Sequence, residues 1–123
     1  MCVAVVYKPP DATVTRFSDA LQFLADKIQA INDDSYQFCL TGDFNMSHYD
    51  WKTGTTSPGS SANELKCFEL LLQFVTDYFM NQYVTCPTRK TNTLDLFITN
   101  DDRLVTSVKA LPTQRHNCLT TIW

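Results

Sequence analysis

The first third of the chain alternates between a strand-like and a helix-like spacing of apolar residues. Residues 2–7 form a short apolar run with the β-branched content of a strand, and residues 8–10 stop it because their two prolines cannot continue a ladder. A helix opened by Ser18 or a neighbour follows, and residues 32–35 end it. A second apolar run over residues 36–41 predicts the next strand. The helical stripe has spacings of three and four and consists of Phe17, Leu21, Leu24, Ile28 and Ile31.

The middle of the chain predicts a long polar loop followed by a second helix. The loop covers residues 46–60, and Ser61 with Glu64 forms the pattern of a capping box that opens the helix. The apolar stripe expected on this helix is Leu65, Phe68, Leu72, Val75 and Phe79. Strand, helix, strand and helix in this order predict an α/β layer architecture.

The last third reads as short β-type segments separated by turn residues. Residues 100–102, Asn-Asp-Asp, are the plainest turn. Strands joined by short links favour antiparallel pairing. The segments are 83–85, 94–99, 104–111 and 118–123.

Composition limits the classes of protein that this chain can be. Its 123 residues are enough for one domain, and 44% apolar with 19% charged residues is typical of a globular protein. No apolar run approaches the roughly 18 residues that span a bilayer, and the first run lacks the features of a secretion signal. A net charge of −3 argues against gripping DNA through bulk positive charge. The cysteines form no Cys-x-x-Cys pair, and we expect small buried hydrophobes in a reducing compartment: Cys2, Cys39, Cys67, Cys86 and Cys118.

The first candidate for chemistry is the tetrad of residues 42–45, Gly-Asp-Phe-Asn, where the second apolar run stops. Asp43 can take a proton or face a metal ion, and Asn45 can donate to a phosphate oxygen. Side chains two positions apart at the end of a strand point the same way and can be held rigidly. The alternative interpretation is an ordinary turn.

Two further residues give the tetrad its context. Asp95 lies in an otherwise apolar strand, where a buried carboxylate needs a partner. The alternative is a residue at the edge of the strand that faces solvent. His116 lies before the last apolar run, and its alternative is a plain surface histidine. An aspartate that orients a histidine, together with a second aspartate, is an arrangement that moves protons at a phosphate.

Five short motifs occur in an order that resembles a known family. They are Val5–Pro10, Gly42–Asn45 with Asp50-Trp51, Pro87–Arg89, Leu94–Asn100 and His116. The chain resembles the endonuclease/exonuclease/phosphatase superfamily, related to deoxyribonuclease I, and within it the endonuclease domain of non-LTR (LINE-type) retrotransposons.

The resemblance implies a Mg²⁺-dependent cut of a DNA phosphodiester bond that leaves a 3′-hydroxyl. It implies that Asp43 aligns the attacking water and takes its proton, and that Asn45 holds a phosphate oxygen. Tyr7 would lie against the scissile phosphate or leaving oxygen, and His116, oriented by Asp95, would stabilise the developing charge. The implied partners are DNA and a reverse transcriptase domain in the same polyprotein, with an intracellular, nuclear location and no membrane.

Other polar residues have two interpretations each. Arg89 is a candidate for binding the phosphate backbone, or a solvated cation in a turn. The aromatic residues of the 46–60 loop could stack on DNA bases, but Trp51 anchoring this loop on the core is the preferred interpretation.

The sequence departs from the family pattern in two places. The family's Ser-Asp-His motif reads Gln114-Arg115-His116 here, so a metal-site carboxylate is replaced by a cation. The family's early Asn and metal-binding Glu have no counterpart, so the metal ligands are unknown. We therefore expect residues 1–123 to be the C-terminal portion of one domain. The expected fold is a partial four-layer α/β sandwich with a mixed, mostly antiparallel sheet and two main helices.

These departures lead to three functional expectations. The first is a truncated nuclease domain, inactive as an isolated chain and self-associating through an uncovered apolar face. The second is a phosphoesterase of the same superfamily that acts on a small molecule or lipid headgroup. The third is a non-catalytic interaction module that kept the half-fold.

Overall fold

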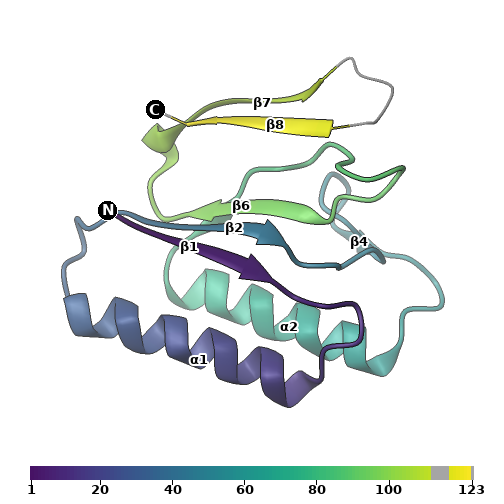
Figure 1. Ribbon diagram of the computed structural model, residues 1–123, viewed down its shortest axis with the longest axis horizontal. Helices are drawn as coiled ribbons and strands as arrows, with labels where there is room; N and C mark the ends of the chain where they lie inside the picture. The colour runs from purple at the N-terminus through teal and green to yellow at the C-terminus, as the bar shows by residue number, and fades with distance from the viewer. Residues whose placement is uncertain (112–116, 123) are drawn as a thin grey trace.

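The chain folds into three layers, with two helices on one face of a central sheet and a two-stranded sheet on the other (Figure 1). The computed structural model describes residues 1–111 and 117–122. The helices are α1 (Val14–Ile31), α2 (Ala62–Asp77) and the short 3-10 helix η1 (Asp102–Leu104). The strands are β1 (Cys2–Tyr7), β2 (Phe38–Asp43), β3 (Tyr49–Asp50), β4 (Thr55–Thr56), β5 (Asn81–Gln82), β6 (Asp95–Thr99), β7 (Val105–Leu111) and β8 (Asn117–Ile122).

The central sheet has the strand order β1-β2-β6-β5. β1 and β2 are parallel because α1 carries the chain back between them, whereas β2 with β6 and β5 with β6 pair antiparallel. The predictions of a mixed, mostly antiparallel sheet and of two main helices are confirmed. The described residues form three layers, so the four-layer sandwich stays a prediction.

The first helix begins earlier than expected. Thr13, not Ser18, is the N-cap, and its hydroxyl accepts a hydrogen bond from the Arg16 N–H at 3.2 Å. Ser18 lies one turn inside the helix, where its neighbours already satisfy the backbone. The helix ends as predicted, because Asn32 takes the left-handed conformation that closes many helices.

The second helix begins as predicted but buries a different face. Ser61 is the N-cap and accepts from the Glu64 N–H, while the Glu64 carboxylate lies beside His48. The expected stripe is right for Phe68 and Val75, which contact the core. It is wrong for Leu65 and Leu72, which are exposed, and for Phe79, which lies beyond the end of the helix. This helix is apolar on more than one side, and packing selected the face made by Cys67, Phe68, Leu71 and Phe74.

Several strands also differ from the sequence-based expectation. β2 starts two residues later and continues through Gly42 and Asp43, because both neighbouring strands supply pairing partners there. The predicted strand at residues 83–85 is absent, and β5 lies just before it. The loop over residues 46–60 contains the β3–β4 hairpin.

The aromatic residues of this hairpin pack on the core. The ring of Tyr49 lies 3.9 Å from Phe68 and 4.8 Å from Trp51, measured between centroids. The interpretation of Trp51 as an anchor for the loop is therefore confirmed.

Most of the core lies between the sheet and the two helices. Leu40, Leu96 and Ile98 face the helices, and each such buried side chain contributes about 1.5–3 kcal/mol. On the other face Cys39 and Phe97 pack under the β7–β8 sheet, with Val84 and Leu104.

The cysteines follow the expectation only in part. Cys2, Cys39 and Cys67 are free, and burial raises the pKa of the Cys67 thiol, so it stays protonated. The expectation is wrong for Cys86, which is disulfide-bonded. Separation along the chain says little about whether two cysteines meet, because a disulfide depends on the distance between their Cβ atoms in the fold.

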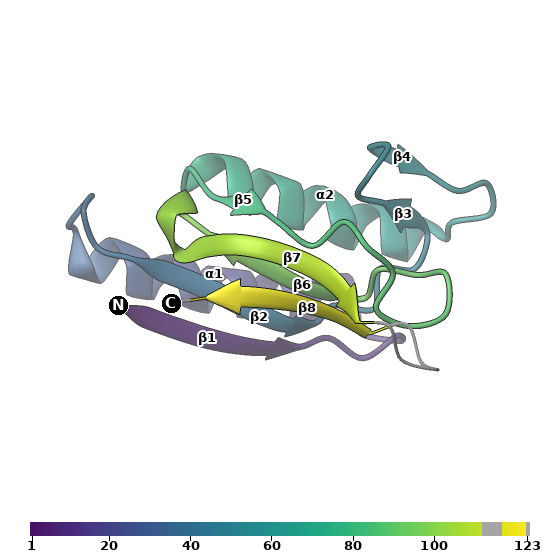
Figure 2. The same cartoon turned by 90° about the horizontal axis from the view of Figure 1, so that it is seen from above.

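The described residues leave the outer face of β1 uncovered. The β7–β8 sheet lies over β6 and β2, and β1 is an edge strand (Figure 2). Val3, Val5 and Tyr7 are therefore exposed, with Val5 at 81%. An uncovered apolar face was expected from the sequence. No helix among the described residues is long and apolar enough to cross a membrane.

Gly42 allows β1 and β2 to approach each other at the end of the sheet that carries Asp43. Its φ is +135°, and a Cβ built there would lie 1.9 Å from the Val6 carbonyl oxygen. A side chain would therefore have to push the two backbones apart.

We predict that Gly42→Ala lowers the free energy of unfolding by at least about 2 kcal/mol, through backbone strain and the clash with Val6. Urea unfolding followed by tryptophan fluorescence measures the change. Gly59→Ala is the matched control, since Gly59 has φ +90° but nothing within 4 Å of its Cβ position. Equal losses in the two variants would show that the close approach contributes nothing.

The uncovered face generates a second prediction, that the chain self-associates at micromolar concentration. Sedimentation velocity should show a concentration-dependent shift that Val5→Lys reduces. Phe79→Lys is the control, because Phe79 is similarly exposed but follows α2. A wild-type chain that stays monomeric through this range would contradict the prediction.

Candidate active site

The strand register places three of the predicted site residues in one row. Tyr7 pairs with Asp43 across β1 and β2, and Asp43 pairs with Asp95 across β2 and β6. Residues directly abreast in a sheet point to the same face, and here it is the face away from the helices. Tyr7 and Asp95, which lie far apart along the chain, thus both become direct neighbours of Asp43.

Both carboxylate oxygens of Asp43 are engaged. Oδ1 accepts a hydrogen bond from the Asn45 backbone N–H at 3.0 Å, which closes a tight turn after β2. Oδ2 lies 3.2 Å from Nη2 of Arg89. The turn holds the carboxylate in one orientation, and the guanidinium balances its charge beside Asp95.

Asn45 is held by the end of β1. Its backbone is left-handed, with φ +49°, and its Nδ2 donates to the Lys8 carbonyl oxygen at 2.6 Å. The Lys8 N–H in turn donates to the Asp43 carbonyl at 2.9 Å. Within the described part of the chain, the second amide hydrogen of Asn45 and its oxygen make no further hydrogen bond, which leaves them for a ligand.

The turn that carries Arg89 is tied to the first residues of β6. The N–H groups of Thr88 and Arg89 donate to the Asn92 carbonyl, and Asn92 donates back to Arg89. The Thr88 hydroxyl accepts from the N–H groups of Leu94 and Asp95, at 2.9 and 3.1 Å. This brings Arg89, predicted as a phosphate contact, to the same row as Asp43 and Asp95.

His116 and Arg115 lie outside the described residues. The expected contact between Asp95 and His116, and the consequence of Arg115 in place of a carboxylate, therefore stay predictions. The other five predicted residues lie together at the end of the central sheet where β1 and β2 finish and β6 begins. They are Tyr7, Asp43, Asn45, Arg89 and Asp95.

The described part of the chain contains no group of three or more His, Cys, Asp or Glu residues that could hold a metal ion. Mg²⁺ prefers oxygen ligands and is often bound through one or two carboxylates and several waters. Asp43 and Asp95 are the carboxylates nearest in register, but Asp43 is already paired with Arg89. These residues by themselves do not build a complete magnesium site.

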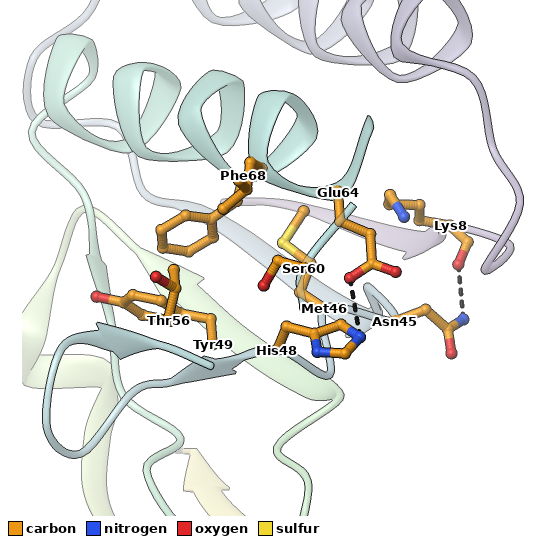
Figure 3. Close-up of a pocket in the computed structure, with 10 residues that line it drawn as sticks. Lys8, Asn45, Met46, His48, Tyr49, Thr56, Ser60, Glu64 and Phe68 are labelled. Carbon is orange, nitrogen blue, oxygen red and sulfur yellow. Dashed lines mark hydrogen bonds and ion pairs between the residues drawn. The ribbon is translucent and has the colours of Figure 1, made fainter. Parts of the chain in front are cut away.

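A small pocket lies beside Asn45 (Figure 3). His48 Nε2 is 3.3 Å from Glu64 Oε2, which connects the loop after β2 to the first turn of α2. Lys8 and Asn45 line the pocket, whereas Tyr7, Asp43 and Asp95 do not. Its remaining walls include Met46, Tyr49 and Phe68, so it belongs to the hairpin's packing on the core.

The sequence reasoning missed two residues that hold the site in place. Lys8 is almost fully buried and supplies the carbonyl that binds the Asn45 amide. Thr88 belongs to the Pro-Thr-Arg motif, but its hydrogen bonds to β6 depend on a tertiary contact. A buried lysine has no signature in the sequence. A threonine seven residues before a strand could have been interpreted as a side-chain cap on the amides at the start of that strand.

We predict that Thr88→Val lowers the free energy of unfolding by about 1–3 kcal/mol, because two partly buried N–H groups lose their acceptor. Urea unfolding measures the loss. Thr88→Ser, which keeps the hydroxyl, should retain most of the stability. A valine variant as stable as wild type would mean that water replaces the hydroxyl at no cost.

Comparison with known proteins shows the family of the chain. No curated protein and no solved structure matches the chain. A model of the endonuclease-reverse transcriptase family matches residues 1–118, which is nearly the whole sequence. The chain therefore belongs to the endonuclease-reverse transcriptase family, as an endonuclease/exonuclease/phosphatase-type domain from a retroelement.

Proposed function

We propose that the row formed by Tyr7, Asp43 and Asp95 is the hydrolytic site of a DNA endonuclease that serves a non-LTR retrotransposon. The observation that carries the proposal is the register, which brings a phenol and two carboxylates together at one sheet edge. Family membership supplies the reaction class, and DNA as the substrate follows from the resemblance.

The proposed chemistry is attack of water on a phosphodiester phosphorus. Asp43 orients the water and accepts its proton as the P–O bond to the water forms. The bond from phosphorus to the 3′-oxygen breaks, and Tyr7 would give that oxygen a proton. Asn45 and Arg89 hold the non-bridging oxygens, whose charge increases in the transition state.

A magnesium ion, when bound, would supply further charge neutralisation at the phosphate. Asp43 and Asp95 are the carboxylates that would face it, together with ligands from outside the described residues. We propose that the described residues do not complete the metal site by themselves, so that the chain on its own is inactive or nearly so.

A non-catalytic interaction module is the second candidate, and the contact between Arg89 and Asp43 favours it. An ion pair that closes the site in every state would keep the carboxylate from acting as a base. A phosphoesterase for small molecules has no observation of its own in its favour.

Plasmid nicking tests the proposal. The longest product of the open reading frame should convert supercoiled plasmid to open circles in Mg²⁺. Asp43→Asn should lower the rate by about 10²–10⁴-fold, the usual contribution of a general base. Asp34→Asn, in the exposed turn after α1, is the matched control and should nick like the unmodified protein.

Two results would contradict the proposal. Nicking by Asp43→Asn at the unmodified rate would remove Asp43 from the chemistry. No nicking by the unmodified protein in Mg²⁺ or Mn²⁺ would exclude hydrolysis and leave the interaction module.

A further inference from the structure

We infer that Arg89 is an exchangeable counterion of Asp43, released to the DNA backbone when a phosphate enters the site. The inference rests on the proposed function, because it concerns how the same site passes from its free to its bound state. In the free chain the guanidinium neutralises the carboxylate. In the bound chain it would contact a phosphate, and Asp43 would become free to hold water.

The two oxygens of Asp43 differ in what binds them. Oδ1 accepts a backbone hydrogen bond inside a tight turn, and that bond would break only if the turn opened. Oδ2 contacts only the Arg89 side chain among the interactions that the structure shows for it. The oxygen that could receive a proton from water is therefore the one that Arg89 occupies.

Arg89 can leave without disturbing the fold around it. Its backbone is fixed by the hydrogen bonds with Asn92, and the preceding Thr88 is bonded to the start of β6. Its side chain is 59% exposed, whereas that of Asp43 is 16% exposed. Only the guanidinium has to move, and water can reach it before and after the movement.

The exchange is energetically feasible. Exposed ion pairs change an equilibrium constant by about fivefold or less, so a competing anion can displace one. A phosphodiester offers two oxygens to the planar guanidinium, and bidentate contacts of this kind are among the stronger charge-assisted hydrogen bonds. The contact in the free chain is through a single nitrogen, Nη2.

The alternative role for Arg89 is a permanent clamp. Asp43 and Asp95 lie directly opposite each other, and like charges in this position destabilise a sheet. A guanidinium that only offsets this repulsion would stay in place when DNA binds. The two roles predict different DNA affinities for the double variant of Asp43 and Arg89, relative to the two single variants.

A double-mutant cycle on DNA binding distinguishes them. Fluorescence anisotropy with a labelled 20-base-pair duplex in EDTA measures affinity without cleavage, for the unmodified protein, Asp43→Asn, Arg89→Gln and the double variant. Exchange predicts that Asp43→Asn tightens binding about two- to fivefold, because Arg89 is already free. This gain should be lost or much reduced in the Arg89→Gln background.

Two further measurements complete the test. Arg89→Gln should weaken binding and reduce the slope of log K against log salt by about 1, as expected for one lost phosphate contact. Arg89→Lys keeps the charge without the planar fork. Its affinity for DNA should lie between those of the unmodified protein and Arg89→Gln. Urea unfolding of all the variants separates effects on binding from effects on folding.

Three results would overturn the inference. The same gain from Asp43→Asn in both backgrounds would show simple repulsion between Asp43 and DNA. An unchanged affinity and salt slope in Arg89→Gln would identify Arg89 as the permanent clamp. If no DNA binding can be measured, no backbone phosphate enters the site to displace Arg89 from Asp43, and the inference fails. The readout is binding, so nicking can succeed while the exchange fails, and the exchange can succeed while nicking fails.

Discussion

The candidate site depends on the position of β2 between two partners whose registers both end at Asp43. The parallel ladder with β1 aligns Asp43 with Tyr7, and the antiparallel ladder with β6 aligns it with Asp95. A shift of one residue in either ladder would move one member of the row to the face packed against the helices. The Gly42–Val6 approach is part of the same constraint, since it lets the first ladder continue to its last pair.

Hydrogen bonds beyond the ends of the strands extend this constraint into the loops. The Phe44 N–H donates to the Leu94 carbonyl, and the Lys8 N–H donates to Asp43, so the segments after β1 and β2 remain tied to their neighbours. Thr88 does the same for the turn that carries Arg89. Polar side chains on loops thereby acquire fixed positions on a rigid sheet edge, which is what chemistry at a phosphate requires.

Much of the fold could be predicted from local signals. The caps Asn32 and Ser61 rest on interactions within a few residues, which composition and spacing reveal. The strand over residues 2–7 is signalled by its own apolar run, although its partner β2 lies far along the chain. The buried face of α2 could not be predicted, because the helix is apolar on several sides. The choice between Leu72 and Leu71 was made by contact with the sheet and with α1.

The candidate site divides in the same way. The sequence by itself determined which groups are present: the carboxylates of Asp43 and Asp95, the Asn45 amide and the arginine of the Pro-Thr-Arg motif. Only the tertiary structure decided that Arg89 contacts Asp43 and that the Lys8 carbonyl holds Asn45. The physical reason is that side-chain chemistry belongs to single residues. Proximity between residues far apart along the chain, such as the 37 positions between Lys8 and Asn45, is created by strand pairing. The register of that pairing follows from burying one whole face of the sheet.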